Sequence, residues 1–306
     1  MMRVMSNAYH TSVLLQACID YLNIKPDGIY VDLTFGGGGH SKHILKALGH
    51  DGKLLAFDQD EDASKNTLKD PRFTLIPQNF RYLKNYLRIN GVLKVDGILG
   101  DLGVSSHQFD EASRGFSIRF DSELDMRMNQ QNPLSAKEVV NTYPEKKLVE
   151  MFRNYAEIVN APKLVFAIIN YRTEKEIVTT EDLKEAIKSC VPKFEAHKYL
   201  AKVFQALRIE VNNEIDALKE CLTQCVEILE TGGRLVMISY HSLEDRLVKN
   251  IIKAGNVEGI EEKDVIYGTG KKIFKNITSK PVLPDEEEIK NNTRARSAKL
   301  MAAIKL

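Results

Sequence analysis

Apolar and polar positions alternate along the first third of the chain in a pattern typical of strands joined by helices. β-Branched and aromatic runs predict four strands, at Ile29–Phe35, Lys53–Asp58, Phe73–Ile76 and Val95–Leu102. Helical spacing predicts helices before and between these strands, at Val13–Leu22, Ser41–Leu48 and Phe80–Ile89. Because strands that alternate with helices pair in parallel, the pattern predicts a doubly wound α/β sheet.

A second region shows only helical periods. Between Glu111 and Leu200 they occur at Lys147–Tyr155, Lys163–Tyr171 and Thr180–Ser189. This segment carries 14 Lys and Arg against 14 Asp and Glu, so it is neutral. We therefore expect an all-helical domain at 111–203, inserted into a discontinuous α/β domain made of 1–110 and 204–306.

After residue 203 the sheet pattern resumes. Apolar residues at three- and four-residue steps predict one long helix from Phe204 to Leu229, which Thr231–Arg234 ends. Leu235–Tyr240 is then predicted to be a buried strand. The end of the chain, Ile289–Leu306, holds five Lys and Arg and no acid, which predicts a solvated basic tail, with an RNA-contacting arm as the alternative.

Composition narrows the class of protein. The chain has 306 residues, 43% of them hydrophobic, and a net charge of +1, so no global basic field draws it to nucleic acid. Four cysteines make no disulfide framework, and Cys221 and Cys225 are interpreted as buried thiols rather than metal ligands. There is no signal-peptide core and no apolar run of membrane-spanning length, so we expect a cytoplasmic protein without a membrane partner.

Four consecutive glycines, Gly36–Gly39, separate the first predicted strand from the helix that follows. A strand, a glycine turn and a helix N-terminus are typical of a site for an adenosine-type cofactor, and Asp58 lies at the spacing of a ribose ligand. Asp32 ahead of the glycines, and Ser41 in place of a further glycine, favour S-adenosylmethionine over NAD. An NAD-dependent oxidoreductase is the alternative enzyme class.

Two further motifs follow predicted strands. Asp101 begins a polar segment that extends to Gln108, and its carboxylate is placed to accept a hydrogen bond from the exocyclic amine of a nucleobase, or to hold the cofactor. Later in the chain, Ser242 and Asp245 are predicted to cap a helix. His241 beside them has either a role in the site or a local hydrogen-bonding role, and the sequence leaves both open.

Ordered motifs along the whole chain resemble the bacterial 16S rRNA (cytosine-N4) methyltransferase H family. These motifs are Tyr9–Leu15, Asp32–Ser41, Asp96–Ser106, Arg114–Ser117, Leu124–Met128, Phe204–Asn212, Gly232–Val236, His241–Arg246 and Arg294–Ser297. The resemblance implies a Rossmann-like class I methyltransferase sheet with an inserted helical domain. It also implies transfer of a methyl group from S-adenosylmethionine to N4 of a cytidine in the decoding region of 16S rRNA, within the small ribosomal subunit.

The resemblance carries over a set of cofactor-binding positions, namely Gly38, Gly39, His40, Asp58, Phe80, Asp101 and Gln108. We expect no metal site. Asp101 is also the candidate catalytic residue, with His241 as a second candidate. Phe80 is expected to cover the adenine, although a core aromatic is the plainer interpretation.

The chain departs from the family pattern at a few positions. It has His107 where the family usually has Pro, Gly100 where it has an apolar residue, and Ser122 and Glu123 where Gly-Pro is frequent. A non-catalytic RNA-binding factor that keeps the cofactor pocket is a further alternative, which the intact Asp101 motif counts against. The sequence leaves the oligomeric state open, a homodimer included.

Overall fold

The computed structural model describes residues 12–261 and 272–306, and these form two compact units. The sheet unit comprises the described residues up to Gly103 and from Ala217 onward, and the helical unit comprises Val104–Asp216. The first three residues of the Tyr9–Leu15 motif lie outside the described residues. No helix in the two described ranges is long and apolar enough to cross a membrane.

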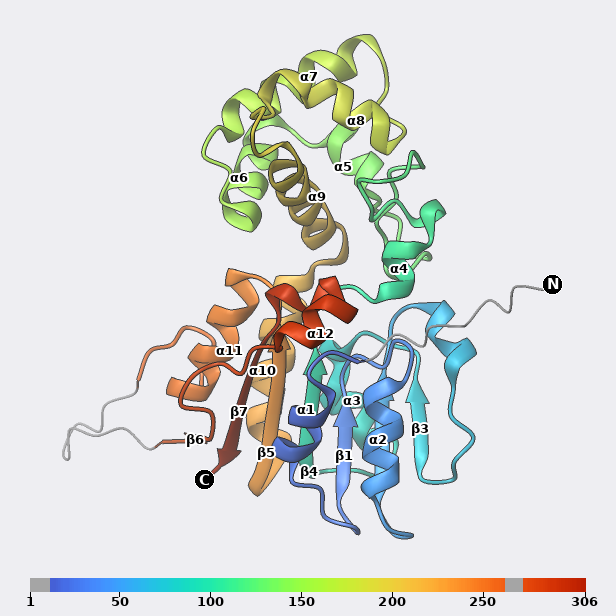
Figure 1. Ribbon diagram of the computed structural model, residues 1–306, viewed down its shortest axis with the longest axis vertical. Helices are drawn as coiled ribbons and strands as arrows, with labels where there is room; N and C mark the ends of the chain where they lie inside the picture. The colour runs from blue at the N-terminus through green and yellow to red at the C-terminus, as the bar shows by residue number, and fades with distance from the viewer. Residues whose placement is uncertain (1–11, 262–271) are drawn as a thin grey trace. The chain divides into compact units, whose positions relative to one another are not determined.

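The sheet unit is built on seven strands in the order β3-β2-β1-β4-β5-β7-β6 (Figure 1). The first five strands pair in parallel, whereas β7 and β6 run antiparallel at one edge. This order confirms the expected α/β, Rossmann-like fold. The strands are β1 Ile29–Asp32, β2 Lys53–Phe57, β3 Phe73–Ile76, β4 Val95–Asp101, β5 Leu229–Ser239, β6 Phe274–Asn276 and β7 Lys299–Lys305.

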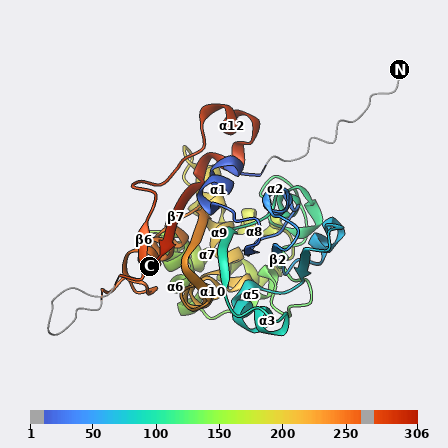
Figure 2. The same ribbon diagram turned by 90° about the horizontal axis from the view of Figure 1, so that it is seen from below.

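Helices cover both faces of this sheet, with α1 and α2 on one side and α3 and α10 on the other (Figure 2). Alternate strand residues such as Leu54 and Ala56, or Leu300 and Ala302, pack in one core with Cys18 and Ile44 of the first pair of helices. The helical segments are α1 Leu15–Leu22, α2 Gly39–Ala47, η1 Glu61–Asn66, η2 Phe80–Tyr82, α3 Leu83–Ile89, α10 Glu214–Ile228, α11 Ser242–Ala254, α12 Glu286–Asn291 and η5 Thr293–Ser297. The thiols of Cys221 and Cys225 are buried in α10, as expected.

Two predictions about the sheet are wrong. Thr231–Arg234 does not end a helix but lies inside β5, where Gly232 has a φ of 84° and the pairing with β4 shifts register. A glycine in this conformation allows a β-bulge, which sequence spacing cannot distinguish from a helix stop. The basic end of the chain is not a solvated tail, because β7 is a largely buried strand paired with β5. There Lys305 extends its ammonium to the carbonyl oxygen of Leu229, at 2.9 Å.

The predicted single helix from Phe204 to Leu229 is also wrong, since it is two helices. Asn213 has a φ of 49° and ends α9 (Ala196–Asn212) in the left-handed conformation, which asparagine tolerates better than most residues. The apolar stripe continues through this break and therefore conceals it. Because Phe204 and Val211 pack in the core of the helical unit, that unit extends to Asp216 rather than to the expected residue 203. Its other end is Val104, ahead of the expected residue 111.

The helical unit has its own hydrophobic core, formed around Phe152, Leu164 and Leu207. Its segments are α4 Ser106–Asp110, η3 Ala112–Arg114, α5 Ala136–Thr142, α6 Glu145–Ala156, α7 Ala161–Glu174, α8 Thr180–Ile187, η4 Lys188–Cys190 and α9. Serine and threonine capping boxes begin α5 and α8, which explains why these short helices start where they do.

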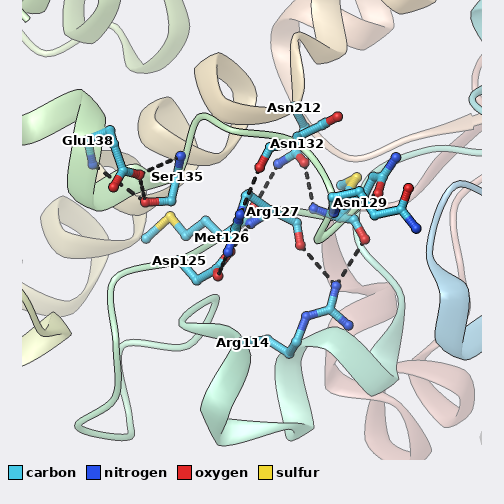
Figure 3. A network of polar contacts seen from close by, with 11 residues as sticks. Arg114, Asp125, Met126, Arg127, Asn129, Asn132, Ser135, Glu138 and Asn212 are labelled. Atoms are coloured by element: carbon cyan, nitrogen blue, oxygen red, sulfur yellow. Dashed lines mark hydrogen bonds and ion pairs between the residues drawn. The ribbon is translucent and has the colours of Figure 1, made fainter.

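A buried loop in this unit is held by side chains from two distant motifs (Figure 3). Met126 has no exposed surface and a φ of 61°, a conformation that is unusual for a residue other than glycine. Asn212 accepts a hydrogen bond from the Met128 N–H at 2.7 Å and donates one to the Met126 carbonyl at 2.8 Å. Arg114 donates to the carbonyls of Arg127 and Met128, at 2.9 and 3.0 Å. The loop therefore satisfies its buried backbone groups with side chains instead of secondary structure.

We predict that Asn212→Ala destabilises the helical unit by about 2–4 kcal/mol, because it leaves a buried N–H and a buried carbonyl without their partner. Hydrogen exchange of peptides from this unit, measured in the full chain, gives the local opening free energy. Asn170→Ala is the matched control, since Asn170 lies exposed on α7 and should change that free energy by less than about 0.5 kcal/mol. Equal protection in all three proteins would show that other contacts hold the loop.

Candidate cofactor and substrate site

The site lies in the sheet unit at the carboxyl ends of β1 and β4. These central neighbours connect onward to opposite sides of the sheet, and ligands of doubly wound sheets bind at such a switch point. Two hydrogen bonds join the strand ends. The Leu33 N–H donates to the Leu99 carbonyl at 2.8 Å, and the Asp101 N–H donates to Thr34 Oγ1 at 2.7 Å. This edge therefore places Asp101 beside the glycine turn that follows β1.

The glycine turn is shaped by its own backbone and by Asp32. Gly38 has a φ of 74°, and a Cβ at this position would lie 2.9 Å from the Phe35 ring, so a side chain would strain the turn twice over. Asp32 is 1% exposed and accepts hydrogen bonds from Ser41 Oγ at 2.7 Å and from the Thr34 N–H at 3.0 Å. Asp32 thus fixes the turn from inside the fold.

Asp58 holds the other side of the same turn. Its Oδ2 accepts the Gly36 N–H at 2.8 Å, and its Oδ1 accepts the Asp60 N–H at 2.9 Å. Burial raises the pKa of Asp58 to about 6, although both backbone hydrogen bonds oppose the rise. The carboxylate expected to bind ribose therefore lies directly at the glycine turn, with a charge that is costly to bury.

Asp101 and His40 face each other across the site. His40 is 5% exposed, and its Nε2 lies 3.0 Å from the Val13 carbonyl, which fixes the ring. Its Nδ1 lies 4.0 Å from Asp101 Oδ2. Burial raises the pKa of Asp101 to about 6, whereas the nearby His40 and a hydrogen bond from Tyr240 act to lower it. The structure thus brings together a histidine and an acid that are distant in sequence.

Tyr240 is a residue that the sequence analysis missed. Its hydroxyl donates to Asp101 Oδ1 at 2.7 Å from the end of β5, the strand beside β4. The available signal was its position, since a polar aromatic residue ends a buried strand next to one that ends in Asp101. In the motif after β5, the sequence analysis considered only His241 as a site residue.

Two further cofactor candidates are Phe80 in the sheet unit and Gln108 in the helical unit. Phe80 begins η2 and is partly exposed, which disfavours the interpretation as a core aromatic. Gln108 belongs to the helical unit, where it completes a capping box with Ser105 at the start of α4. The Ser105 N–H donates to Gln108 Oε1 at 3.0 Å. A local capping role thus accounts for the motif's serine and glutamine.

The prediction that Ser242 and Asp245 cap α11 is wrong. His241 is the N-cap residue, without a side-chain capping bond, and its carbonyl accepts the Asp245 N–H at 3.1 Å. Glu244 instead reaches back to accept the Tyr240 N–H at 2.8 Å. His241 Nε2 lies 3.2 Å from Glu244 Oε1 without the alignment of a hydrogen bond. The His241 ring therefore contacts Glu244 without a described hydrogen bond, and this gives no support to a local hydrogen-bonding role.

The residues of the sheet unit fit S-adenosylmethionine. At Gly37 an added Cβ would meet no described atom within 4 Å, so the turn leaves room for a ligand on that side. Asp58 is an acceptor suited to ribose hydroxyls, and Phe80 offers a partly exposed ring for adenine. The carboxylates of Asp58 and Asp101 offset the positive charge of a sulfonium.

Comparison with known proteins identifies the family. Residues 7–306 match the MraW methylase family. The chain is 58% identical to the ribosomal RNA small subunit methyltransferase H of Christiangramia forsetii, over 97% of this chain and 98% of that protein. It is 53% identical to the protein of the same name from Bacteroides fragilis, over 99% and 100% of the two chains. A solved structure of an rRNA methylase from Streptococcus thermophilus is a more distant likeness, with 14% identity, a TM-score of 0.42 and coverage of 94% and 93%.

The matches extend over nearly the full length of the chain, so they include both the sheet unit and the helical unit. They confirm the expected enzyme class, a methyltransferase whose methyl donor is S-adenosylmethionine, over an NAD-dependent oxidoreductase. The chain belongs to the MraW methylase family.

Proposed function

We propose that this protein methylates N4 of a cytidine in the decoding region of 16S rRNA, within the small ribosomal subunit of the cytoplasm. The relatives named above support the ribosomal substrate, since they are small subunit rRNA methyltransferases more than half identical to this chain. We choose an amine as the methyl acceptor because of Asp101, a fixed carboxylate at the switch point beside the glycine turn.

The amine of cytosine is a weak nucleophile because its lone pair is delocalised into the ring. When bound, S-adenosylmethionine supplies a methyl group activated by a positively charged sulfur. Asp101 accepts a hydrogen bond from the amine, which localises the lone pair and orients it toward the methyl carbon. As the N–C bond forms and the S–C bond breaks, the amine nitrogen loses a proton, for which Asp101 is the nearest acceptor in this scheme.

Other residues of this chain bind and orient the donor. We propose that Asp58 binds the ribose and that Phe80 contacts the adenine. Gly38, Gly39 and His40 form the turn that the donor approaches closely. Gln108 is a secondary candidate, because a local capping role already accounts for its position. His241 remains a second candidate, and its ring lies beside Glu244 at the start of α11. The turn also leads into the N-terminus of α2, where helix geometry leaves backbone N–H groups without partners inside the helix.

The helical unit is our candidate for RNA recognition. It carries the strained loop of Figure 3, and the segment between Glu111 and Leu200 is neutral. A neutral surface binds naked RNA weakly, since affinity for phosphate comes from Lys and Arg. We therefore propose that the enzyme recognises the shape of an assembled particle.

The first test is transfer of labelled methyl from S-adenosylmethionine to small subunits that lack the modification, followed by nucleoside analysis. We expect the label in N4-methylcytidine, with faster transfer to assembled subunits than to free 16S rRNA. Label in another nucleoside would refute the assignment of the acceptor atom, and equal rates on both substrates would refute recognition of the assembled particle.

Asp101→Asn keeps the shape of the side chain but removes its charge, so we expect transfer to fall by at least about 100-fold. Binding of the small subunit, measured by sedimentation, should stay unchanged, which separates the enzyme from a non-catalytic RNA-binding factor. Asp51→Asn is the control, because Asp51 is exposed and precedes β2, at the amino ends of the parallel strands and away from the site. Full activity of Asp101→Asn would remove this residue from the chemistry.

Cofactor affinity should depend on pH through Asp58. The ionised carboxylate accepts the ribose hydroxyls, and its pKa in the free protein is about 6. Below that pH the affinity for S-adenosylmethionine should fall by up to about tenfold per pH unit, as measured by calorimetry between pH 7.5 and 5. In Asp58→Asn, binding should be weaker at pH 7.5 and this pH dependence reduced, since Asp101 still titrates. A pH dependence equal to that of the native chain would exclude Asp58 as the ribose ligand.

Stability of the free protein should change in the opposite direction. The raised pKa means that Asp58 takes up a proton near pH 6 in the folded chain but near pH 4 in the unfolded one. Between those values the folded state binds more protons, so this group's contribution to the free energy of unfolding rises as the pH falls. Between about pH 6 and pH 4, affinity for S-adenosylmethionine should therefore fall while the contribution of Asp58 to the free energy of unfolding rises.

A further inference from the structure

Tyr240 is the residue at the candidate site to which neither the motifs nor the family match assigns a role. It follows β5, whose neighbour β4 ends in Asp101, so the two residues lie at adjacent carboxyl ends of the sheet. The Tyr240 hydroxyl donates to Asp101 Oδ1 at 2.7 Å.

Two contacts fix Tyr240. Its N–H donates to Glu244 Oε2 at 2.8 Å, which ties the end of β5 to the first turn of α11. Its ring packs against the core that includes Cys18 of α1, and a Cβ added at Gly103, two residues after Asp101, would lie 3.6 Å from the ring carbon Cδ2. The backbone hydrogen bond and the packing of the ring therefore hold the hydroxyl beside Asp101.

Asp101 is in turn held by two hydrogen bonds and faces His40. Its N–H donates to Thr34 Oγ1, its Oδ1 accepts from Tyr240, and its Oδ2 lies 4.0 Å from His40 Nδ1. The tyrosine bond occupies one lone pair of Oδ1 and prevents rotation of the carboxylate about its Cβ–Cγ bond. The remaining lone pairs keep fixed directions, which an in-line transfer requires.

We propose that Tyr240 is a positioning residue for methyl transfer, whose hydroxyl orients the Asp101 carboxylate toward the amine of the target base. This inference rests on the proposed function of Asp101. The hydroxyl touches neither the base nor the donor in this scheme, and it acts through the carboxylate alone.

The charges around Asp101 show what a hydrogen-bond donor contributes there. Asp32 at the end of β1 and Glu244 of α11 are negative groups that disfavour its ionised form, and burial does so most strongly. His40 and the Tyr240 hydroxyl favour the ionised form. Burial and the negative Asp101 both raise the pKa of Tyr240, so its hydroxyl keeps its proton and remains a donor. The Cys18 thiol, also nearby, has a pKa raised well above its usual value by burial and by Asp101.

Tyr240→Phe tests the proposal with little change of shape. Removal of a hydrogen bond to a charged group should lower kcat/KM for rRNA methylation by about tenfold or more at neutral pH. The acid limb of the pH profile should move up by about one pH unit, because the ionised form of Asp101 loses a donor. Affinity for S-adenosylmethionine at pH 8 should stay within about twofold of the native value.

Tyr30→Phe is the matched control. Tyr30 is a buried tyrosine of the same sheet. Its hydroxyl accepts the Lys25 N–H at 2.8 Å near the amino end of β1, whereas the site lies at the carboxyl end. We expect this variant to lose stability without a shift of the acid limb. A shift in Tyr30→Phe, or an unchanged rate and pH profile in Tyr240→Phe, would overturn the proposal.

A second readout needs no RNA. Carbon-13 NMR of the aspartate carboxyls, with Asp101→Asn to assign the signal, gives the pKa of Asp101 in the free protein. We expect Tyr240→Phe to raise it, and an unchanged value would overturn the inference. If the native enzyme transfers no methyl group to rRNA, the proposed function fails, whereas the carboxyl titration still decides whether Tyr240 controls Asp101.

Discussion

The pairing of β1 with β4 is the constraint on which the site depends. Because β1 connects to one side of the sheet and β4 to the other, the backbone diverges beyond their carboxyl ends and leaves a place for a ligand. Thr34 closes the base of that opening by accepting the Asp101 N–H. The glycine turn, the buried His40 and the Asp101 carboxylate are all positioned relative to these two strand ends. A register shift of one residue would turn Asp101 to the other face.

Three acids end three neighbouring strands, and the structure gives them different surroundings. Asp32 is fully engaged within the fold, where Ser41 and the Thr34 N–H satisfy it. Asp58 and Asp101 also accept hydrogen bonds, but unlike Asp32 they remain partly exposed at the strand ends, and each has a pKa raised to about 6. Buried carboxylates with raised pKa values are frequent at functional sites, since a ligand that is positive or donates hydrogen bonds recovers the free energy lost by desolvation. The fold thus distinguishes one structural acid from two acids suited to bind ligands.

In the helical unit, motifs that carry no reactive groups are required for folding. Arg114 and Asn212 come from motifs far apart in sequence, and both bind the backbone of the loop around Met126. The left-handed conformation of Met126 costs free energy, and the buried hydrogen bonds offset that cost. The same restraint makes the loop rigid, a useful property for a surface proposed to recognise the shape of a particle. These motifs are therefore explained first by folding and only then by substrate.

The sequence by itself determined the α/β class, the strand-terminal acids, the glycine turn and the helical insertion, because each depends on local periodicity or on residue types with strong conformational preferences. It also determined the family, through ordered motifs along the chain. Only the tertiary structure decided that Asp32 faces inward, that Tyr240 contacts Asp101, and that the basic end of the chain is a strand of the sheet. It likewise separated α9 from α10 at Asn213 and moved the limits of the helical unit. The physical reason is that pairing between distant strands and the direction of a buried side chain depend on neighbours that local sequence does not encode.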